Sequence, residues 1–181
     1  MIIRAATDAD AAALAAIYGH HVLHGFGTFE EIPPDPEEMA RRRAAVAERG
    51  LPYLVAEDGG RVLGFAYAGL FRPRAAYRYT VEDSVYIAPD AVGQGVGRAV
   101  LSGVLAACEA MGLRQVVAVI GDSGNAASIG LHRSLGFEEA GVVRSVGFKH
   151  GRWVDIVTMQ KALNGGDGRA PDAQGLTLGG G

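Results

Sequence analysis

The chain has 181 residues, of which 49% are hydrophobic and 20% are charged, a balance typical of a single globular domain. Its net charge of -3 and its lack of a long basic segment give no sign of a nucleic-acid-binding face, and no apolar stretch is long enough to predict a membrane span. The single cysteine, Cys108, excludes an internal disulfide, and the N-terminus shows no hydrophobic signal segment, so we expect a cytoplasmic protein.

The first half of the chain predicts one strand, two helices and a hairpin. Pro36 is suited to open the second helix and Gly50 to end it, because proline fits the first helical turn and glycine fits the position after the last one. Gly59 and Gly60 lie between two apolar segments and predict a hairpin turn. The expected elements are a strand at 1–6, a helix ending near His24, a loop at 25–36, a helix at 37–49, and strands at 53–58 and 61–71.

The second half predicts four more strands and two more helices. Residues 115–120 form a continuous apolar run, which is typical of a strand buried on both faces, and Gly136 is suited to end a helix. The expected elements are a polar loop at 72–78, a strand at 79–89, a helix ending near Gly112, a strand at 115–120, a helix at 125–135, and two strands around Lys149, His150 and Gly151.

This order predicts an α/β fold of the α+β type, a mixed sheet covered by helices in one domain over residues 1–163. Residues 164–181 are rich in glycine and lack a core pattern, so we expect a disordered tail.

The stretch "SVYIAPDAVGQGVGRAVL" leads from a strand through Gly93, Gly95 and Gly97 into a helix. Glycines let the backbone approach a ligand, and amides at a helix N-terminus attract anions, so this loop favours a phosphate or pyrophosphate. The chain has neither the GxxxxGK[ST] string of a P-loop nor the GxGxxG string of a dinucleotide fingerprint. A glycine-rich turn without a ligand remains an alternative.

Three stretches carry a resemblance to a known family: "YAGLFRPRAAYRYTVEDSVYI", "VVAVIGDSGNAASIGLHRSLGF" and "GFKHGRWVDIVTMQ". They resemble the phosphinothricin acetyltransferase group of the GNAT N-acetyltransferase superfamily, which includes enzymes for methionine sulfoximine and sulfone. The resemblance covers roughly residues 2–162. It implies a single-domain GNAT fold with a mixed, mostly antiparallel sheet and helices on both faces, acetyl-CoA as co-substrate, and a homodimer whose interface the C-terminal strands would supply.

The glycine loop matches the family's CoA loop at residues 92–97, except that Val92 stands where the family has glutamine or arginine. We expect this departure to weaken or change the binding of the pyrophosphate without abolishing it, because the amides remain. The resemblance places the cofactor on these amides, on the main chain of the preceding strand and on an asparagine. The residues concerned are Val85, Tyr86, Ile87, Gly93, Gln94, Gly95, Val96, Gly97, Arg98 and Asn125.

Acetyl transfer to an amine needs a base, and Glu82 interrupts an apolar strand where the resemblance places that base. Burial would raise its pKa and suit it to this task, whereas a solvent-facing edge carboxylate is the alternative. By strand periodicity Asp83 lies on the opposite face, and we expect it to be structural. His132 stands where many superfamily members have a tyrosine that protonates the departing thiolate, and it is the second catalytic candidate. A packed helix histidine, or one that only contacts CoA, is the alternative.

The acceptor is expected to be a small amino-acid-like molecule. Arg72 and Arg74 match the family's basic substrate-binding positions, and guanidinium groups suit carboxylate, phosphinyl and sulfoximine oxygens. Alone, two loop arginines would more often be solvated. Phe29 and Tyr77 are candidates for the walls of the acceptor pocket, with core or lid packing as the alternative. No histidine, cysteine and carboxylate pattern indicates a metal.

The sequence therefore predicts an acetyl-CoA-dependent N-acetyltransferase that acts on the α-amine of phosphinothricin, methionine sulfoximine or methionine sulfone by direct transfer. Two alternatives stay open. One is an acetyltransferase for a protein N-terminus or an aminoglycoside, although Arg72 and Arg74 disfavour a polycation. The other is a non-catalytic acyl-CoA-binding module, which would need neither Glu82 nor His132. Neither a nucleic acid nor a membrane is an expected partner.

Overall fold

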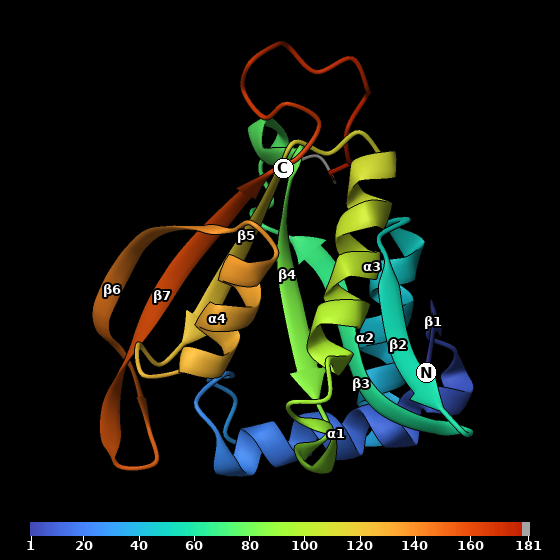
Figure 1. Cartoon of the computed structure of the whole chain (residues 1–181), viewed down its shortest axis with the longest axis vertical. Coiled ribbons are helices and arrows are strands. Elements are labelled where there is room, and N and C mark those ends of the chain that lie inside the picture. Colours follow the sequence, from blue (N-terminus) through green and yellow to red (C-terminus); the bar gives the residue numbers. More distant parts are fainter. Residues whose placement is uncertain (179–181) are drawn as a thin grey trace.

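The structure is a computed structural model and describes residues 1–178. It forms a seven-stranded sheet with strand order β1-β2-β3-β4-β5-β7-β6 (Figure 1). The strands are β1 (Ile2–Ala5), β2 (Tyr53–Asp58), β3 (Arg61–Leu70), β4 (Thr80–Ile87), β5 (Gln115–Gly121), β6 (Glu138–Lys149) and β7 (Arg152–Ala162), and the helices are α1 (Ala11–His24), α2 (Pro36–Glu48), α3 (Val96–Ala110) and α4 (Ala126–Ser134).

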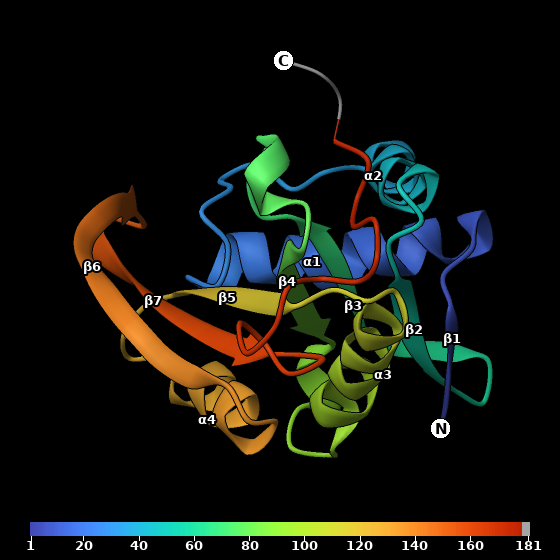
Figure 2. The ribbon, with the colours of Figure 1, turned by 90° about the horizontal axis from the view of Figure 1, so that it is seen from above.

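Seen from above, α1 and α2 cover one face of the sheet and α3 and α4 cover the other (Figure 2). Every neighbouring strand pair is antiparallel except β4 and β5, which are parallel. The predicted order of strands and helices and the mixed, mostly antiparallel sheet are confirmed. Pro36 lies in the first turn of α2 as expected, and Asp35 caps that helix by accepting a hydrogen bond from the Glu38 amide.

The parallel pair β4–β5 is short, and this determines where the site forms. The pairing runs only from Thr80 opposite Gln115 to Asp83 opposite Ala118. Beyond that point β4 continues to Ile87 and β5 continues to Gly121, so the two strands diverge. A fork of this kind leaves main-chain groups of β4 without a neighbouring strand, and these groups are available to a ligand.

The core lies on both sides of β5, as its continuous apolar run predicted, because Val116, Ala118 and Ile120 are buried together with Val117. Helix α3 packs over β3 and β4 and contributes Cys108, which is fully buried. Burial raises the pKa of this thiol to about 12. Cys108 is therefore a packing residue, as expected from its apolar surroundings.

Residues 164–178 contain no helix or strand but contact the domain at several points. The buried Arg114 donates hydrogen bonds to the carbonyl oxygens of Gly166 and Arg169, each over 2.8 Å. The Leu176 amide donates to the carbonyl of Arg78, and the Leu176 side chain is buried. No sequence pattern indicates these contacts, because one leucine among glycines makes no periodic pattern. The boundary at 163 and the disorder of this segment stay predictions, and residues 179–181 of the predicted tail lie outside the described residues.

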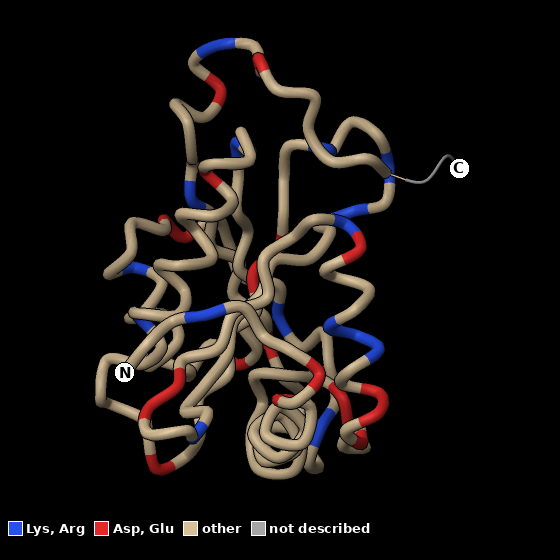
Figure 3. The backbone as a smooth tube through the Cα atoms, turned by 90° about the vertical axis from the view of Figure 1, so that its right-hand side faces the viewer, with Lys and Arg blue, Asp and Glu red and all other residues tan. Residues whose placement is uncertain are grey.

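Lys and Arg residues and Asp and Glu residues are spread along the whole trace in Figure 3, in keeping with the small net charge. Within residues 1–178, no helix is both long and apolar enough to cross a membrane. The cytoplasmic location stays a prediction.

Candidate active site

The glycine loop lies between β4 and α3. Gly93 and Gly95 have φ angles of 80° and 81°, in the left-handed region that glycine adopts readily, and Gly95 is the N-cap of α3. Gly97 lies in the first turn, where an added Cβ would be 3.1 Å from Leu131 on α4. The first amides of α3 have no partner within the helix and carry its positive dipole end, so the loop can hold an anion.

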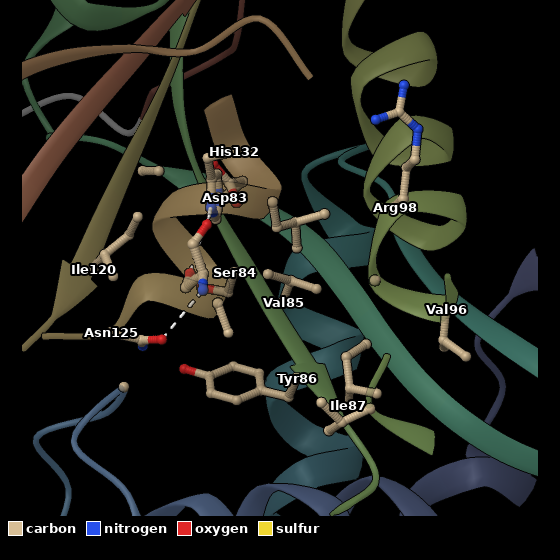
Figure 4. Close-up of a pocket in the computed structure, with 18 of the residues that line it drawn as sticks. Asp83, Ser84, Val85, Tyr86, Ile87, Val96, Arg98, Ile120, Asn125 and His132 are labelled. Carbon is tan, nitrogen blue, oxygen red and sulfur yellow. Dashed lines mark hydrogen bonds and ion pairs between the residues drawn. The ribbon is translucent and has the colours of Figure 1, made fainter. Parts of the chain in front are cut away.

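A cavity of about 540 Å³ extends from this loop into the fork between β4 and β5 (Figure 4). Its lining includes most of the residues predicted to hold the cofactor: Val85, Tyr86, Ile87, Gly93, Gly95, Val96, Gly97, Arg98 and Asn125. Its long shape, with glycine amides at one end and strand main chain along the side, suits a ligand with a pyrophosphate and an extended amide-bearing arm. The residues present therefore fit acetyl-CoA.

Two loop side chains are held by neighbours. Gln94 is absent from the cavity lining, and its side chain donates a hydrogen bond to the carbonyl of Asp90 over 2.7 Å. It therefore stabilises the loop by bracing the turn before α3. Arg98 lines the cavity and its guanidinium donates to the carbonyl and hydroxyl oxygens of Ser134. Val92 is 60% exposed and lines the cavity, and its effect on pyrophosphate binding stays a prediction.

Asn125 is the N-cap of α4, where its side-chain oxygen accepts a hydrogen bond from the Ser128 amide over 3.1 Å. Figure 4 shows this residue at the cavity wall, near the end of β5. Its Nδ2 atom lies 3.4 Å from the carbonyl oxygen of Gly121, at the end of β5. A contact with the cofactor stays a prediction.

Glu82 lies on the part of β4 that is still paired, opposite Gly69 of β3 and Val117 of β5. It is not among the residues that line the cofactor cavity, although Ser84 and Tyr86, which follow it on the same face of the strand, are. Burial raises the pKa of this carboxyl, the neighbouring Asp83 raises it further, and the charge of Arg72 lowers it. The net effect is a raised pKa, which suits a carboxylate that must accept a proton.

Asp83 and His132 form a buried pair on the cavity side. His132 Nε2 lies 3.0 Å from Asp83 Oδ2, and His132 Nδ1 lies 2.8 Å from the carbonyl oxygen of Ser128. The His132 residue is only 2% exposed. Burial lowers the pKa of the imidazole, but the hydrogen bond and charge of Asp83 outweigh this, so the pKa of His132 is raised. Figure 4 shows the two side chains together at the apex of the fork.

Sequence reasoning missed several residues of this cavity: His21, Gly27, Asp83 and Ser128. Asp83 was expected to be structural, and it shares its face of β4 with Val85 and Ile87, which also line the cavity. His21 lies in α1 and Gly27 lies in the loop after it, and both are distant in sequence from the fork. Local sequence patterns do not indicate that α1 and this loop lie beside the fork.

The predicted acceptor residues come from one loop and one distant segment. Arg72 and Arg74 lie in the exposed loop before β4, and Tyr77 in the same loop contacts Phe71 edge-to-face at a ring distance of 5.6 Å. The charge of Arg72 reaches Glu82, as its effect on the pKa of that carboxyl shows. Phe29 lies in the loop after α1, where an added Cβ at Gly121 or Gly147 would meet its ring. Whether these residues bind the acceptor stays a prediction.

Within residues 1–178, no group of three or more His, Cys, Asp or Glu side chains is arranged to hold a metal ion.

Comparisons with known proteins agree with this geometry. A model described as the acetyltransferase (GNAT) family matches residues 19–137. The phosphinothricin N-acetyltransferase of Alcaligenes faecalis is 58% identical over 170 residues, which cover 94% of this chain and 86% of that protein. The L-methionine sulfoximine/L-methionine sulfone acetyltransferase of Pseudomonas aeruginosa is 45% identical over 166 residues, covering 90% of this chain and 94% of that protein.

A solved structure is similarly close. The crystal structure of a GNAT superfamily phosphinothricin acetyltransferase from Sinorhizobium meliloti, in complex with acetyl-CoA, matches with a TM-score of 0.92 and 46% identity, covering 96% of this chain and 94% of that one. The predicted family, fold and co-substrate are thereby confirmed. The chain belongs to the GNAT family of acetyltransferases, and it is an N-acetyltransferase that uses acetyl-CoA.

Proposed function

We propose that this enzyme acetylates the α-amine of a small amino-acid-like acceptor: phosphinothricin, methionine sulfoximine or methionine sulfone. The observation that carries the proposal is the half-buried Glu82 on β4, whose carboxyl is influenced by the charge of Arg72 in the exposed loop before that strand. A base and a guanidinium suit an acceptor with both an amine and an oxygen-rich anionic group. The names of the relatives agree with this class of acceptor.

The cofactor would lie along the main chain of Val85, Tyr86 and Ile87, with its pyrophosphate on the amides of Gly93 to Gly97 and its thioester at the apex of the fork. Acetyl-CoA supplies an activated acyl group there. For direct transfer the acceptor amine would have to enter the fork and lie against the thioester carbonyl, so both substrates would be bound at once.

Glu82 would take the proton that the amine must lose, directly or through water. Its raised pKa brings its basicity closer to neutral pH, where a general base works best. The C–N bond to the acceptor then forms and the C–S bond breaks, so that negative charge develops on the thiolate.

His132 would assist that thiolate. Both of its ring nitrogens already have partners, Asp83 and the Ser128 carbonyl. A role through positive charge, sustained by Asp83, therefore fits this geometry better than direct donation of a proton.

The function is tested by measuring thiol release from acetyl-CoA with each of the three acceptors, using the wild type, Glu82→Gln and, as a matched control, the exposed Glu139→Gln. Turnover that Glu82→Gln abolishes and Glu139→Gln retains would support both the acceptor class and the base. Turnover that survives Glu82→Gln would contradict the role of Glu82. No thiol release with any of the three acceptors, although acetyl-CoA still binds, would contradict the acceptor class and favour another amine or a binding module.

We also propose a homodimer that forms through the β6–β7 hairpin. This hairpin exposes an unusual number of large apolar side chains: Val142, Val143, Val146, Phe148 and Trp153. Apolar side chains gathered on one strand pair commonly mark an interface. Light scattering should give twice the chain mass for the wild type and a monomer for Val143→Asp. A monomeric wild type at micromolar concentration would overturn this proposal.

A further inference from the structure

Strand β6 ends at a lysine that is almost completely buried. Lys149 is 1% exposed, and its ammonium donates hydrogen bonds to the carbonyl oxygens of Gly25 and Thr28 over 2.9 and 2.8 Å. Both carbonyls belong to the loop that follows α1. A lysine rarely occupies a fully buried position, so this one is expected to have a specific task.

The turn itself fixes where that ammonium lies. His150 and Gly151 have φ angles of 50° and 76°, which is the pattern of a tight hairpin turn with two left-handed residues. The turn also grips Phe26: the Arg152 guanidinium lies 3.9 Å from the centre of its ring, and the His150 ring meets it edge-to-face at 5.5 Å. The hairpin therefore contacts the loop at three points: the carbonyl of Gly25, the ring of Phe26 and the carbonyl of Thr28.

The other side of the loop is held by α1 and α2. The Thr28 hydroxyl lies 2.8 Å from the Tyr18 hydroxyl, which in turn donates to Glu30 over 2.9 Å. Glu30 forms an ion pair with Arg42 of α2. Tyr18 contacts Tyr86 of the cofactor cavity edge-to-face at 4.7 Å. Residues 25–30, the gate loop, are thus fixed between the hairpin turn and the helices.

The gate loop touches both halves of the site. Gly27 lines the cofactor cavity and lies near Asn125, since an added Cβ there would be 4.0 Å from its side-chain nitrogen. Phe29 lies against Gly147, where an added Cβ would be 2.3 Å from the ring. At Gly121 an added Cβ would be 1.9 Å from the Phe26 carbonyl oxygen. Gly121 and Gly147 have no side chain and therefore leave room for this conformation of the loop.

The geometry points to Lys149 as a positioning residue for the acceptor. Its buried ammonium holds the gate loop so that Gly27 closes the fork and Phe29 forms a wall beside the acceptor. Lys149 itself touches neither the cofactor cavity nor the reacting atoms, so it acts through the loop carbonyls. This inference rests on the proposed function, because it assumes that the acceptor enters beside Phe29.

The main test is Lys149→Met, which keeps the length of the side chain and removes its donors. The matched control is Lys161→Met, the same change at the only other lysine. For Lys149→Met we expect the acceptor KM to rise about tenfold, because an ill-placed wall weakens positioning, while the dissociation constant of acetyl-CoA, measured by calorimetry, changes by less than about threefold. Lys161→Met should change neither quantity.

Two further measurements separate positioning from a loss of fold. Trp153, the only tryptophan, contacts Phe148 in the same hairpin, so its emission reports whether the hairpin persists. Hydrogen exchange at residues 25–30 reports the loop directly and needs no acceptor. Faster exchange there, with unchanged Trp153 emission and a raised acceptor KM, supports the inference. Unchanged exchange, or equal losses of acceptor and acetyl-CoA binding, would overturn it.

A second variant covers the case in which Lys149→Met does not fold. Gly147→Ala breaks no buried hydrogen bond but places a methyl group where the Phe29 ring lies. It should raise the acceptor KM in the same direction, and an unchanged KM would count against the role of the gate loop. If the wild type turned over none of the acceptors, only the proposed function would be overturned. The hydrogen-exchange measurement on Lys149→Met would still decide whether this lysine holds the loop.

Discussion

Glu82 and Asp83 are neighbouring carboxylates on β4, yet the two faces of the strand give them different surroundings. Asp83 faces α4, is buried, and pairs with His132 over 3.0 Å. Glu82 faces the opposite way, is half-buried, and has a raised pKa to which Arg72 is the opposing influence. The Asp83 carboxylate is therefore held by a partner, whereas the Glu82 carboxylate is suited to accept a proton.

A strand can thus separate stability from chemistry within one residue step. A carboxylate with a buried partner contributes to folding through the hydrogen bond that it accepts. A carboxylate whose pKa is raised by burial gives up stability and gains basicity. We therefore expect substitutions on the two faces to have opposite profiles.

The largest expected effect is that of Glu82→Gln on turnover. The amide cannot accept a proton from the amine, so kcat should fall by about a hundredfold or more. The free energy of unfolding should stay within about 0.5 kcal/mol or increase, because burial already penalises the charged carboxyl. Steady-state kinetics and urea unfolding of the same preparation check both. A large loss of stability would remove the contrast between the faces.

Asp83→Asn should have the opposite profile, with a clear loss of stability and a smaller loss of turnover. Replacing the carboxylate by a neutral amide weakens a buried hydrogen bond to a charged partner, so the free energy of unfolding should fall by about 2 kcal/mol. Turnover should fall less than with Glu82→Gln, since the base on the other face is untouched. Equal losses of kcat in the two variants would show that both faces share the chemistry.

The pH dependence of stability should report the His132–Asp83 pair. Since the folded pKa of His132 lies above its unfolded value of about 6.5, the pair's contribution is complete below pH 6.5 or so and declines as pH rises through the folded pKa. The difference in unfolding free energy between wild type and Asp83→Asn should therefore shrink with rising pH across that interval. A difference that grows with pH would contradict the raised pKa.

The smallest expected effect is that of Arg72→Leu on the acid limb of the rate profile. Arg72 lowers the pKa of Glu82, so its loss should move the acid limb of kcat/KM to higher pH, by less than about one unit for a partly solvated charge. Arg133→Leu, on α4, is the matched control and should leave the limb in place. A shift of the limb to lower pH would contradict the effect of Arg72 on the pKa of Glu82.

Much of the fold could be predicted from the sequence because its signals are local. Pro36, Gly50 and the glycine pair at 59–60 mark helix and hairpin ends through backbone geometry alone. The glycine loop likewise identifies itself by its spacing and by the helix that follows. Such features need no knowledge of distant partners.

The partners of the site residues could not be predicted in this way. The sequence pattern predicts only that Lys149 lies at a turn between two strands, but its ammonium is buried against carbonyls more than a hundred residues away in the chain. The same holds for Arg114 and the C-terminal segment. Single long-range hydrogen bonds leave no periodic trace in a sequence.

The burial of Cys108 has a practical consequence at the bench. Each acetyl transfer liberates one CoA thiol, which a disulfide reagent can count by colour, and the enzyme's only sulfhydryl is hidden within α3 with a pKa of about 12. Folded enzyme should therefore contribute no background to a continuous colorimetric record. The same burial makes the reagent a test of folding, because colour that develops without acetyl-CoA and without an acceptor would report molecules whose core has opened.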